Sequence, residues 1–159
     1  MLVVRHPAER ILSAYLNKFL NPKSRSWRLN NKNSLRIFKY FNESESITFH
    51  QFITYLAKSS LENLPLDEHW TPMSELCSFS VVDYNIIVPL NKLEDTLTEM
   101  SAQFGIPEAI TNKILVQTSK TDSIKLVKDY FGDLDSQLKY AFYKKFEDDH
   151  TFLGYEPYL

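Results

Sequence analysis

The chain opens on a short apolar run that gives way at once to a helical pattern. Leu2–Val4 is continuously hydrophobic, which is typical of a central strand covered on both faces. Pro7 suits the first position of a helix, because its missing N–H would be unpaired there in any case. From Ala8 to Leu20 the apolar residues recur at helical spacing. Residues 1–20 are therefore predicted to form a strand, a tight turn and a helix.

The pattern of the remaining chain predicts a helix-rich α/β domain. Residues 21–46 are expected to form a long basic loop with some helix near 35–41, residues 59–75 an irregular segment, and residues 79–88 a second strand. Helices are expected after a capping box at Thr48–Gln51 and over 92–104, 107–116, 123–130 and 133–147. Two strands do not make a stable open sheet. We therefore expect an incomplete parallel sheet, and a chain that is the carboxy-terminal portion of a longer protein.

Composition excludes several classes of site. The 159 residues support one domain over residues 1–159. The single cysteine, Cys77, excludes an internal disulfide framework and a Cys-rich zinc site. The three glycines are far apart, so the chain contains no glycine-rich phosphate loop. No metal site is expected.

The net charge of −2 hides a strong asymmetry along the chain. Residues 1–39 hold nine Lys or Arg and one acidic residue, whereas the other 120 residues hold nine Lys or Arg and nineteen acidic residues. The amino-terminal quarter is therefore suited to a phosphate, a sulfated sugar or a nucleic acid. The alternative is a solvated basic surface balanced by acidic helices. A nucleic-acid partner is not expected, because the basic residues lack interleaved aromatics on a sheet face.

The first turn places Arg5 where an anion could bind. Arg5 follows the strand, and ligands of open α/β sheets bind at the carboxyl ends of strands. Its planar guanidinium can donate two parallel hydrogen bonds to a phosphate, and Ser13 lies about two turns into the following helix. The alternative is that Arg5 pairs with an acid at the sheet edge, while Glu9 and Arg10 form a surface pair.

This segment resembles the 3′-phosphate-binding signature of Golgi carbohydrate sulfotransferases. The matching positions are Val4, Arg5, Pro7, Glu9, Arg10, Ser13, Ala14, Tyr15, Lys18 and Phe19. Similarity to the chondroitin, dermatan and HNK-1 group of that family continues at Asp67–Pro72, Leu76–Cys77, Asp83–Tyr84, Leu93–Asp95 and Phe152–Tyr155. The resemblance therefore spans nearly the whole chain in the family's order.

The resemblance implies a partial P-loop-NTPase-like sulfotransferase fold. It also implies transfer of a sulfuryl group from 3′-phosphoadenosine 5′-phosphosulfate to a glycan hydroxyl. Arg5 and Ser13 would hold the 3′-phosphate of this donor. The residues between them would line the same site: His6, Pro7, Ala8, Glu9, Arg10, Ile11 and Leu12. The family's phosphosulfate loop lies upstream of this signature and is missing here, so the chain alone is expected to be inactive. The alternative function is a degenerate, non-catalytic relative that binds an anionic glycan or a nucleotide.

Two further residues are candidates for the site. His69 is the histidine best placed to take the proton of the acceptor hydroxyl. The alternative is that His69 and Trp70 pack to hold their loop, with the base upstream. Lys120 stands in a loop similar to one that closes over the cofactor in relatives; the alternative is a solvated loop lysine. His50 and His150 are expected on the surface.

The resemblance also bears on partners and location. It implies a glycan or glycosaminoglycan acceptor, which the basic segment Lys23–Lys39 is expected to help hold. It implies a lumenal enzyme of the Golgi membrane, anchored by a segment outside this chain. Asn42–Ser44 fits an acceptor for N-linked glycosylation. Many relatives carry Cys-x-x-Cys where this chain has Ser80, so Cys77 is either a buried thiol or paired with an upstream cysteine.

Overall fold

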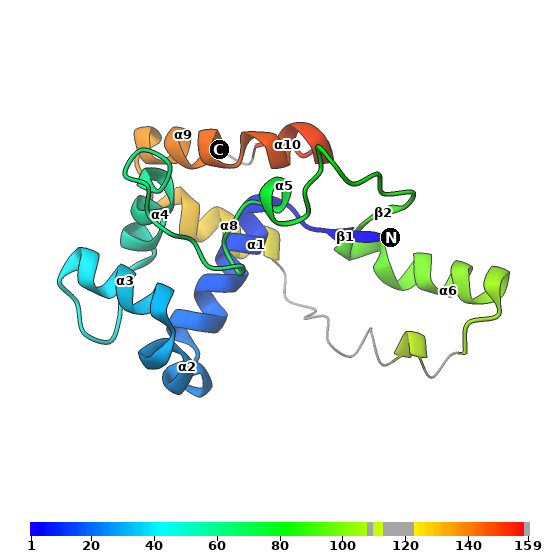
Figure 1. Cartoon of the computed structure of the whole chain (residues 1–159), viewed down its shortest axis with the longest axis horizontal. Helices are drawn as coiled ribbons and strands as arrows, with labels where there is room; N and C mark the ends of the chain where they lie inside the picture. The colour runs from blue at the N-terminus through cyan, green and yellow to red at the C-terminus, as the bar shows by residue number, and fades with distance from the viewer. Residues whose placement is uncertain (108–109, 113–122, 158–159) are drawn as a thin grey trace. The chain divides into compact units, whose positions relative to one another are not determined.

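The structure is a computed structural model that describes residues 1–107, 110–112 and 123–157 (Figure 1). These residues belong to two compact units. The first unit comprises Met1–Arg5 with Val82–Asp122, and the second comprises His6–Val81 with Ser123–Leu159. The chain passes from one unit to the other between the first strand and the first helix.

The first unit contains a two-stranded parallel sheet and one long helix. Its elements are β1 (Leu2–Val4), β2 (Ile87–Pro89), η3 (Leu90–Lys92) and α6 (Leu93–Phe104). Val3 lies opposite Val88 in the sheet. A small core of Val88, Leu93 and Leu97 joins the sheet to the helix. Gly105 ends α6 with a φ of 65°, a left-handed conformation that favours glycine.

The second unit is helical. Its elements are α1 (Pro7–Tyr15), η1 (Leu16–Leu20), η2 (Pro22–Ser24), α2 (Arg25–Asn30), α3 (Lys32–Phe41), α4 (Phe49–Lys58), α5 (Met73–Leu76), α8 (Ser123–Gly132), α9 (Ser136–Lys145) and α10 (Glu147–Leu153). Helix α4 packs against α9, and α1 packs against α8. The last turn of the first helical segment, η1, is π-helical.

Local sequence explains where the main helices of this unit begin. The His6 side chain accepts a hydrogen bond from the Ala8 backbone at the start of α1, where Pro7 occupies the first turn. Asn31 caps α3 by accepting hydrogen bonds from two backbone N–H groups. Thr48 and Gln51 form the predicted capping box of α4. The apolar faces of these helices bury an aromatic core in which Tyr15 contacts Phe52.

The structure confirms the α/β class and corrects several predicted boundaries. The second strand is limited to Ile87–Pro89, because β1 offers only three residues to pair with. Within 21–46, the helix expected near 35–41 is part of α3, and α2 is a further helix in the stretch predicted as a loop. The helix predicted over 133–147 ends at Lys145, and α10 follows it. Of the helix predicted over 107–116, the described residues 110–112 are helical.

Candidate functional site

The two residues predicted to hold a 3′-phosphate lie on either side of the first turn. Arg5 follows β1 and closes its segment of the first unit. Ser13 lies in α1 of the second unit and is half-buried. Their joint contact with one phosphate stays a prediction. Pro7, Ala8, Ile11 and Leu12, also predicted to line the cofactor site, are buried, and the last three belong to the core of the second unit.

Both ring nitrogens of His6 form hydrogen bonds within the protein. Its Nδ1 accepts a hydrogen bond from the Ala8 backbone at 3.2 Å, and its Nε2 lies 2.8 Å from the carbonyl oxygen of Glu156. Since Nδ1 accepts, Nε2 carries the proton and donates to Glu156, and the ring is neutral. Burial lowers the pKa of His6, the Glu156 carbonyl opposes that shift, and His150 adds to it. His6 therefore links the start of α1 to the end of the chain.

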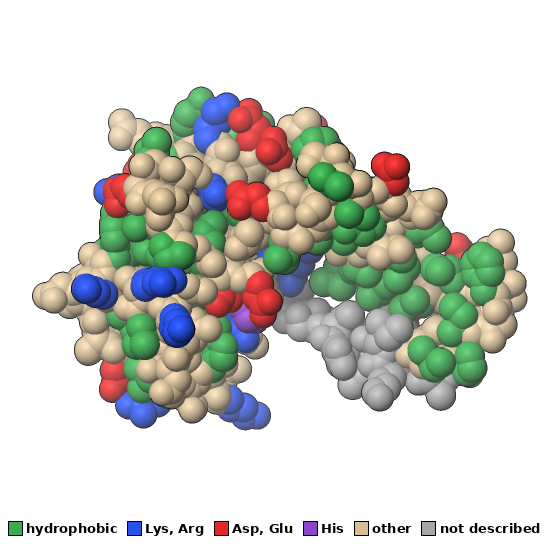
Figure 2. All heavy atoms as spheres, viewed as in Figure 1, with side chains coloured by type: hydrophobic (Ala, Val, Ile, Leu, Met, Phe, Trp, Pro, Cys, Tyr) green, Lys and Arg blue, Asp and Glu red, His purple; other side chains and the backbone are tan. Residues whose placement is uncertain are grey.

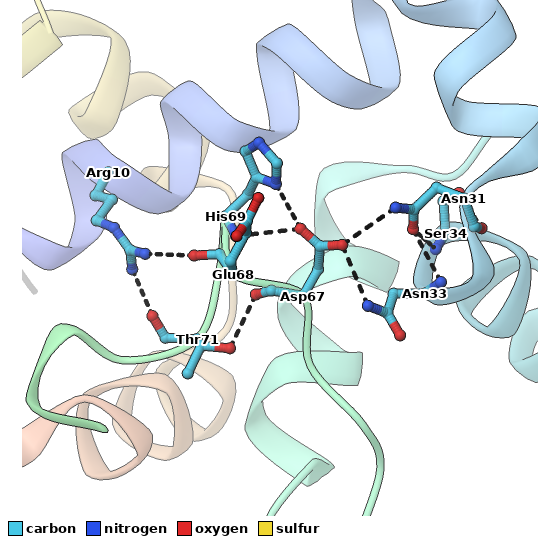
Figure 3. Close-up of polar contacts among 8 residues, drawn as sticks. All are labelled: Arg10, Asn31, Asn33, Ser34, Asp67, Glu68, His69 and Thr71. Carbon is cyan, nitrogen blue, oxygen red and sulfur yellow. Dashed lines mark hydrogen bonds and ion pairs between the residues drawn. The ribbon is translucent and has the colours of Figure 1, made fainter. Parts of the chain in front are cut away.

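Arg10 joins α1 to the irregular segment that carries His69 (Figure 3). Its Nη1 donates to the carbonyl oxygen of Thr71 at 2.6 Å, and its Nη2 donates to that of Glu68 at 2.8 Å. Burial lowers the pKa of Arg10, while Asp149 opposes the shift. The alternative interpretation of Arg10 as half of a surface pair with Glu9 is therefore not what the structure shows, because the guanidinium holds a loop.

That loop brings together an acid and a base. The Nδ1 of His69 is hydrogen-bonded to Oδ1 of Asp67, and the backbone N–H of His69 donates to the same oxygen at 3.2 Å. Asp67 is buried, whereas a third of the His69 side chain (33%) is exposed. Burial alone would raise the pKa of Asp67, but hydrogen bonds from His69 and Asn33 outweigh it and hold that pKa below its ordinary value. An anionic carboxylate thus lies behind a partly exposed imidazole.

His69 and Trp70 differ in their surroundings. Trp70 is fully buried and packs against Phe52, with ring centroids 5.4 Å apart. The His69 ring lies edge-on to Trp27 at 5.6 Å. Trp70 therefore holds the loop in the core, while the His69 side chain stays partly exposed. Its role as a base stays a prediction.

The basic segment forms a charged surface over α2 and α3, where Figure 2 shows Lys and Arg side chains gathered on one face. Its exposed members are Lys23, Arg25, Lys32, Arg36 and Lys39, which we call the basic face. Arg28 is not part of it, because this side chain is buried and donates to the carbonyl oxygens of Glu45 and Lys18. The basic face lies in the same unit as the loop of residues 67–72, which we call the His69 loop.

The other predicted residues have varied surroundings. Lys120 lies outside the described residues. His150 is buried, so its prediction as a surface residue is wrong: its Nδ1 lies 2.9 Å from the Tyr155 carbonyl oxygen, and its ring meets that of His6. His50 is exposed, as expected. Cys77 is half-buried, and burial raises the pKa of its thiol, with Arg10 opposing the shift.

Sequence reasoning missed the residues that hold the His69 loop. Asp67 is part of the family-like motif, but the motif alone predicts no role for it. Asn31 and Asn33 lie in the segment predicted as a loop, although an asparagine directly before a helical pattern is a usual capping signal. Their contacts with Asp67 connect residues 34 or more positions apart, which no local pattern reveals.

Among the described residues, no helix combines the length and apolar character needed to cross a membrane. Nor does this part of the chain hold a cluster of three or more side chains suited to a metal ion.

The strand–turn–helix, the basic face and the helix-rich α/β architecture agree with a family assignment from sequence comparison. The model of the sulfotransferase family matches residues 1–156, so the chain belongs to the sulfotransferase family. Curated relatives narrow the class and confirm the resemblance to carbohydrate sulfotransferases. Carbohydrate sulfotransferase 10 of Xenopus laevis is 27% identical over 97% of this chain and 46% of its own length.

Two human proteins are similar as well. Carbohydrate sulfotransferase 10 of Homo sapiens is 27% identical over 97% of this chain and 46% of its own length. Carbohydrate sulfotransferase 9 of Homo sapiens is 26% identical over 88% of this chain and 34% of its own length. The chain thus spans less than half the length of these relatives. No solved structure matches it.

Proposed function

We propose that this chain is part of a carbohydrate sulfotransferase that uses 3′-phosphoadenosine 5′-phosphosulfate as donor and a glycan hydroxyl as acceptor. The observation that carries the proposal is the family match over residues 1–156. The names of the relatives support the carbohydrate acceptor. The segment from Val4 to Phe19 supports the donor, because it retains both Arg5 and Ser13.

In the proposed reaction the acceptor oxygen attacks the sulfur of the donor. A new S–O bond forms, and the S–O bond to the adenosine phosphate breaks with its electron pair staying on the phosphate. The rate depends on positioning and on neutralising that developing charge. Arg5 and Ser13 would hold the donor by its 3′-phosphate. His69 would accept the proton of the acceptor hydroxyl on Nε2, the ring nitrogen that does not bond to Asp67.

The basic face supports an anionic acceptor such as a glycosaminoglycan. Lys32, Arg36 and Lys39 follow one another at helical spacing on α3, so they lie along one side of that helix. Their Cβ atoms are then about 5–6 Å apart, so the three cations form a row that suits the repeated carboxylates and sulfates of a polysaccharide. In this proposal the enzyme works in the Golgi lumen, where the exposed Asn42 would be accessible for N-linked glycosylation.

The test is a transfer assay with the protein expressed from its complete coding sequence. Radiolabelled donor is offered with desulfated chondroitin, dermatan and glucuronic-acid-terminated glycans. We expect label on at least one acceptor, and an Arg5→Ala variant with at least tenfold weaker donor affinity, because a charge-assisted contact contributes roughly 1.5–3 kcal/mol. Lys58→Ala is the control for loss of a single exposed cation.

The outcomes separate the activity from the residue assignment. Unchanged donor affinity in Arg5→Ala would remove Arg5 from the donor site. Binding of anionic glycans without transfer to any of them would instead favour the non-catalytic alternative.

A further inference from the structure

The carboxylate of Asp67 divides its contacts between its two oxygens (Figure 3). Oδ1 faces His69, whose ring Nδ1 and backbone N–H both bond to it. Oδ2 accepts from Nδ2 of Asn31 at 3.3 Å and from Nδ2 of Asn33 at 3.2 Å. One buried carboxylate therefore connects the start of α3 to the imidazole of the His69 loop.

We propose that Asp67, held by Asn31 and Asn33, is a positioning residue that fixes His69 with a proton on Nδ1 and an open lone pair on Nε2. This inference rests on the proposed function, because the open lone pair is what the acceptor hydroxyl would meet. Neither asparagine touches the imidazole in the structure; both act through Asp67.

The orientation of both amides follows from their other contacts. The Oδ1 atom of Asn31 accepts from the backbone N–H groups of Asn33 and Ser34 at 2.9 and 3.1 Å, as the cap of α3. The Oδ1 atom of Asn33 accepts from Nη1 of Arg36 at 3.0 Å. With both amide oxygens engaged, both NH₂ groups are left to face Asp67. The side of the carboxylate that meets α3 is thus surrounded by donors.

The imidazole tautomer follows in turn. An ionised carboxylate accepts hydrogen bonds and donates none, so Nδ1 of His69 must carry the hydrogen that joins them. The neutral ring then has its lone pair on Nε2, which has no hydrogen-bond partner among the described residues. In Figure 3 the far edge of the ring points away from Asp67. When Nε2 takes the hydroxyl proton, the imidazolium that forms lies against the Asp67 anion.

Replacing Asp67 by asparagine should reverse the tautomer. Two NH₂ groups require an acceptor on the α3 side, so the new amide would turn its oxygen toward Asn31 and Asn33 and its NH₂ toward His69. The imidazole would then accept at Nδ1 and carry its hydrogen on Nε2. We expect kcat of Asp67→Asn to fall at least a hundredfold, the range of a lost general base, with the donor KM within twofold of wild type.

A second variant leaves Asp67 in place. Asn33→Asp keeps an oxygen for Arg36 but replaces the donor to Asp67 by a second carboxylate, and we expect kcat to fall at least tenfold. Asn30→Ala is the matched control, since the Asn30 amide donates to the Ser26 carbonyl oxygen and not to Asp67. Its kcat should stay within twofold of wild type. A kcat within threefold of wild type in both Asp67→Asn and Asn33→Asp would overturn the proposal.

The tautomer itself can be measured without any turnover. Isotope-labelled histidine is incorporated into the complete protein, the ring nitrogens are observed by NMR, and the His69 signals are assigned by their loss in His69→Gln. We expect hydrogen on Nδ1 in the wild type and on Nε2 in Asp67→Asn. Hydrogen on Nε2 in the wild type overturns the inference whatever the activity. Hydrogen on Nδ1 in a protein that transfers no sulfate supports the positioning role while rejecting the proposed function.

Discussion

Asp149 shows how single buried side chains hold the irregular part of the second unit. This carboxylate, 1% exposed, accepts hydrogen bonds from the backbone N–H groups of Met73 and Ser74 at 2.8 and 2.7 Å. It thereby caps α5, a helix of four residues that has no side-chain cap of its own. The loop with His69 is thus fixed at one end by Asp149 and along its length by Arg10.

We expect Asp149→Ala to lower the free energy of unfolding by about 3 kcal/mol, because it leaves two buried N–H groups without an acceptor. The measurement is urea unfolding followed by tryptophan fluorescence. Asp148 is exposed on the same helix, so Asp148→Ala should change stability by less than about 0.5 kcal/mol. Equal effects of the two substitutions would show that Asp149 has no special role.

A second prediction at this scale concerns pH. The pKa of His6 lies below its ordinary 6.5, chiefly because the ring is buried. The unfolded chain therefore takes up a proton as the pH falls through about 6.5, before the folded chain does. The contribution of neutral His6 to the free energy of unfolding is fully present above that pH and is lost progressively below it. The surrounding groups are His150, Tyr155, Glu9 and the Glu156 carbonyl.

The measurement is the unfolding free energy between about pH 7.5 and 5.5. Asparagine at position 6 can still cap α1 but does not titrate, so we expect His6→Asn to reduce the loss of stability on acidification. A His6→Asn protein with the full wild-type slope would contradict the assignment.

The histidines also show what a sequence reveals about single residues. His50 was correctly placed on the surface, because its position in a capping box is a local property. His150 was wrongly placed there. It is buried because the chain after Gly154 turns back and the Tyr155 carbonyl oxygen meets its ring. That contact depends on the tertiary path of the chain, as do those of Asp67 with Asn31 and Asn33.

At the scale of elements, helix α4 was predicted correctly because its start has a local signal. The Thr48 backbone N–H donates to Oε1 of Gln51 at 2.8 Å, and the Gln51 backbone N–H donates to Oγ1 of Thr48 at 3.1 Å. Helix α2 falls in a stretch predicted as a loop, and α3 begins three residues before the helix expected near 35–41, since these sequences are polar and basic. Packing of a few buried residues such as Ile37 and Phe38 stabilises α3.

The capping box of α4 gives a prediction for the element. Thr48→Ala removes one side-chain acceptor at the helix start and should lower the free energy of unfolding by about 1 kcal/mol. Thr48→Ser keeps a hydroxyl at this position and should retain most of the stability of the wild type. Thr54 lies within α4, where its hydroxyl bonds to the His50 carbonyl oxygen, so Thr54→Ala is expected to be neutral or slightly stabilising. Urea unfolding distinguishes the cap from a general effect of losing a threonine if the two alanine variants differ.

At the scale of the whole molecule, charge distribution was more informative than total charge. The asymmetry between residues 1–39 and the rest was visible in the sequence. The structure sorts those basic residues into different roles: Arg10 and Arg28 hold backbone carbonyls, whereas the lysines at 23, 32 and 39 are exposed. A count of charges does not separate these groups, because burial is set by packing.

The basic face therefore predicts binding of an anionic polysaccharide by a protein whose net charge is negative. We expect retention on immobilised chondroitin sulfate at low salt, decreasing as salt screens the contacts. Reversing Lys23, Lys32 and Lys39 to Glu should abolish retention. These lysines are chosen because Arg36 supports Asn33, so the Asp67 network stays intact.

The matched control reverses three exposed lysines elsewhere, Lys58, Lys92 and Lys128. Each reversal changes the charge by two, so the net charge of −2 becomes −8 in both triple variants. If total charge governed binding, the two variants would elute together. If the basic face governs it, only the variant at positions 23, 32 and 39 loses retention. Equal loss in both variants would show that the basic face is not the acceptor surface.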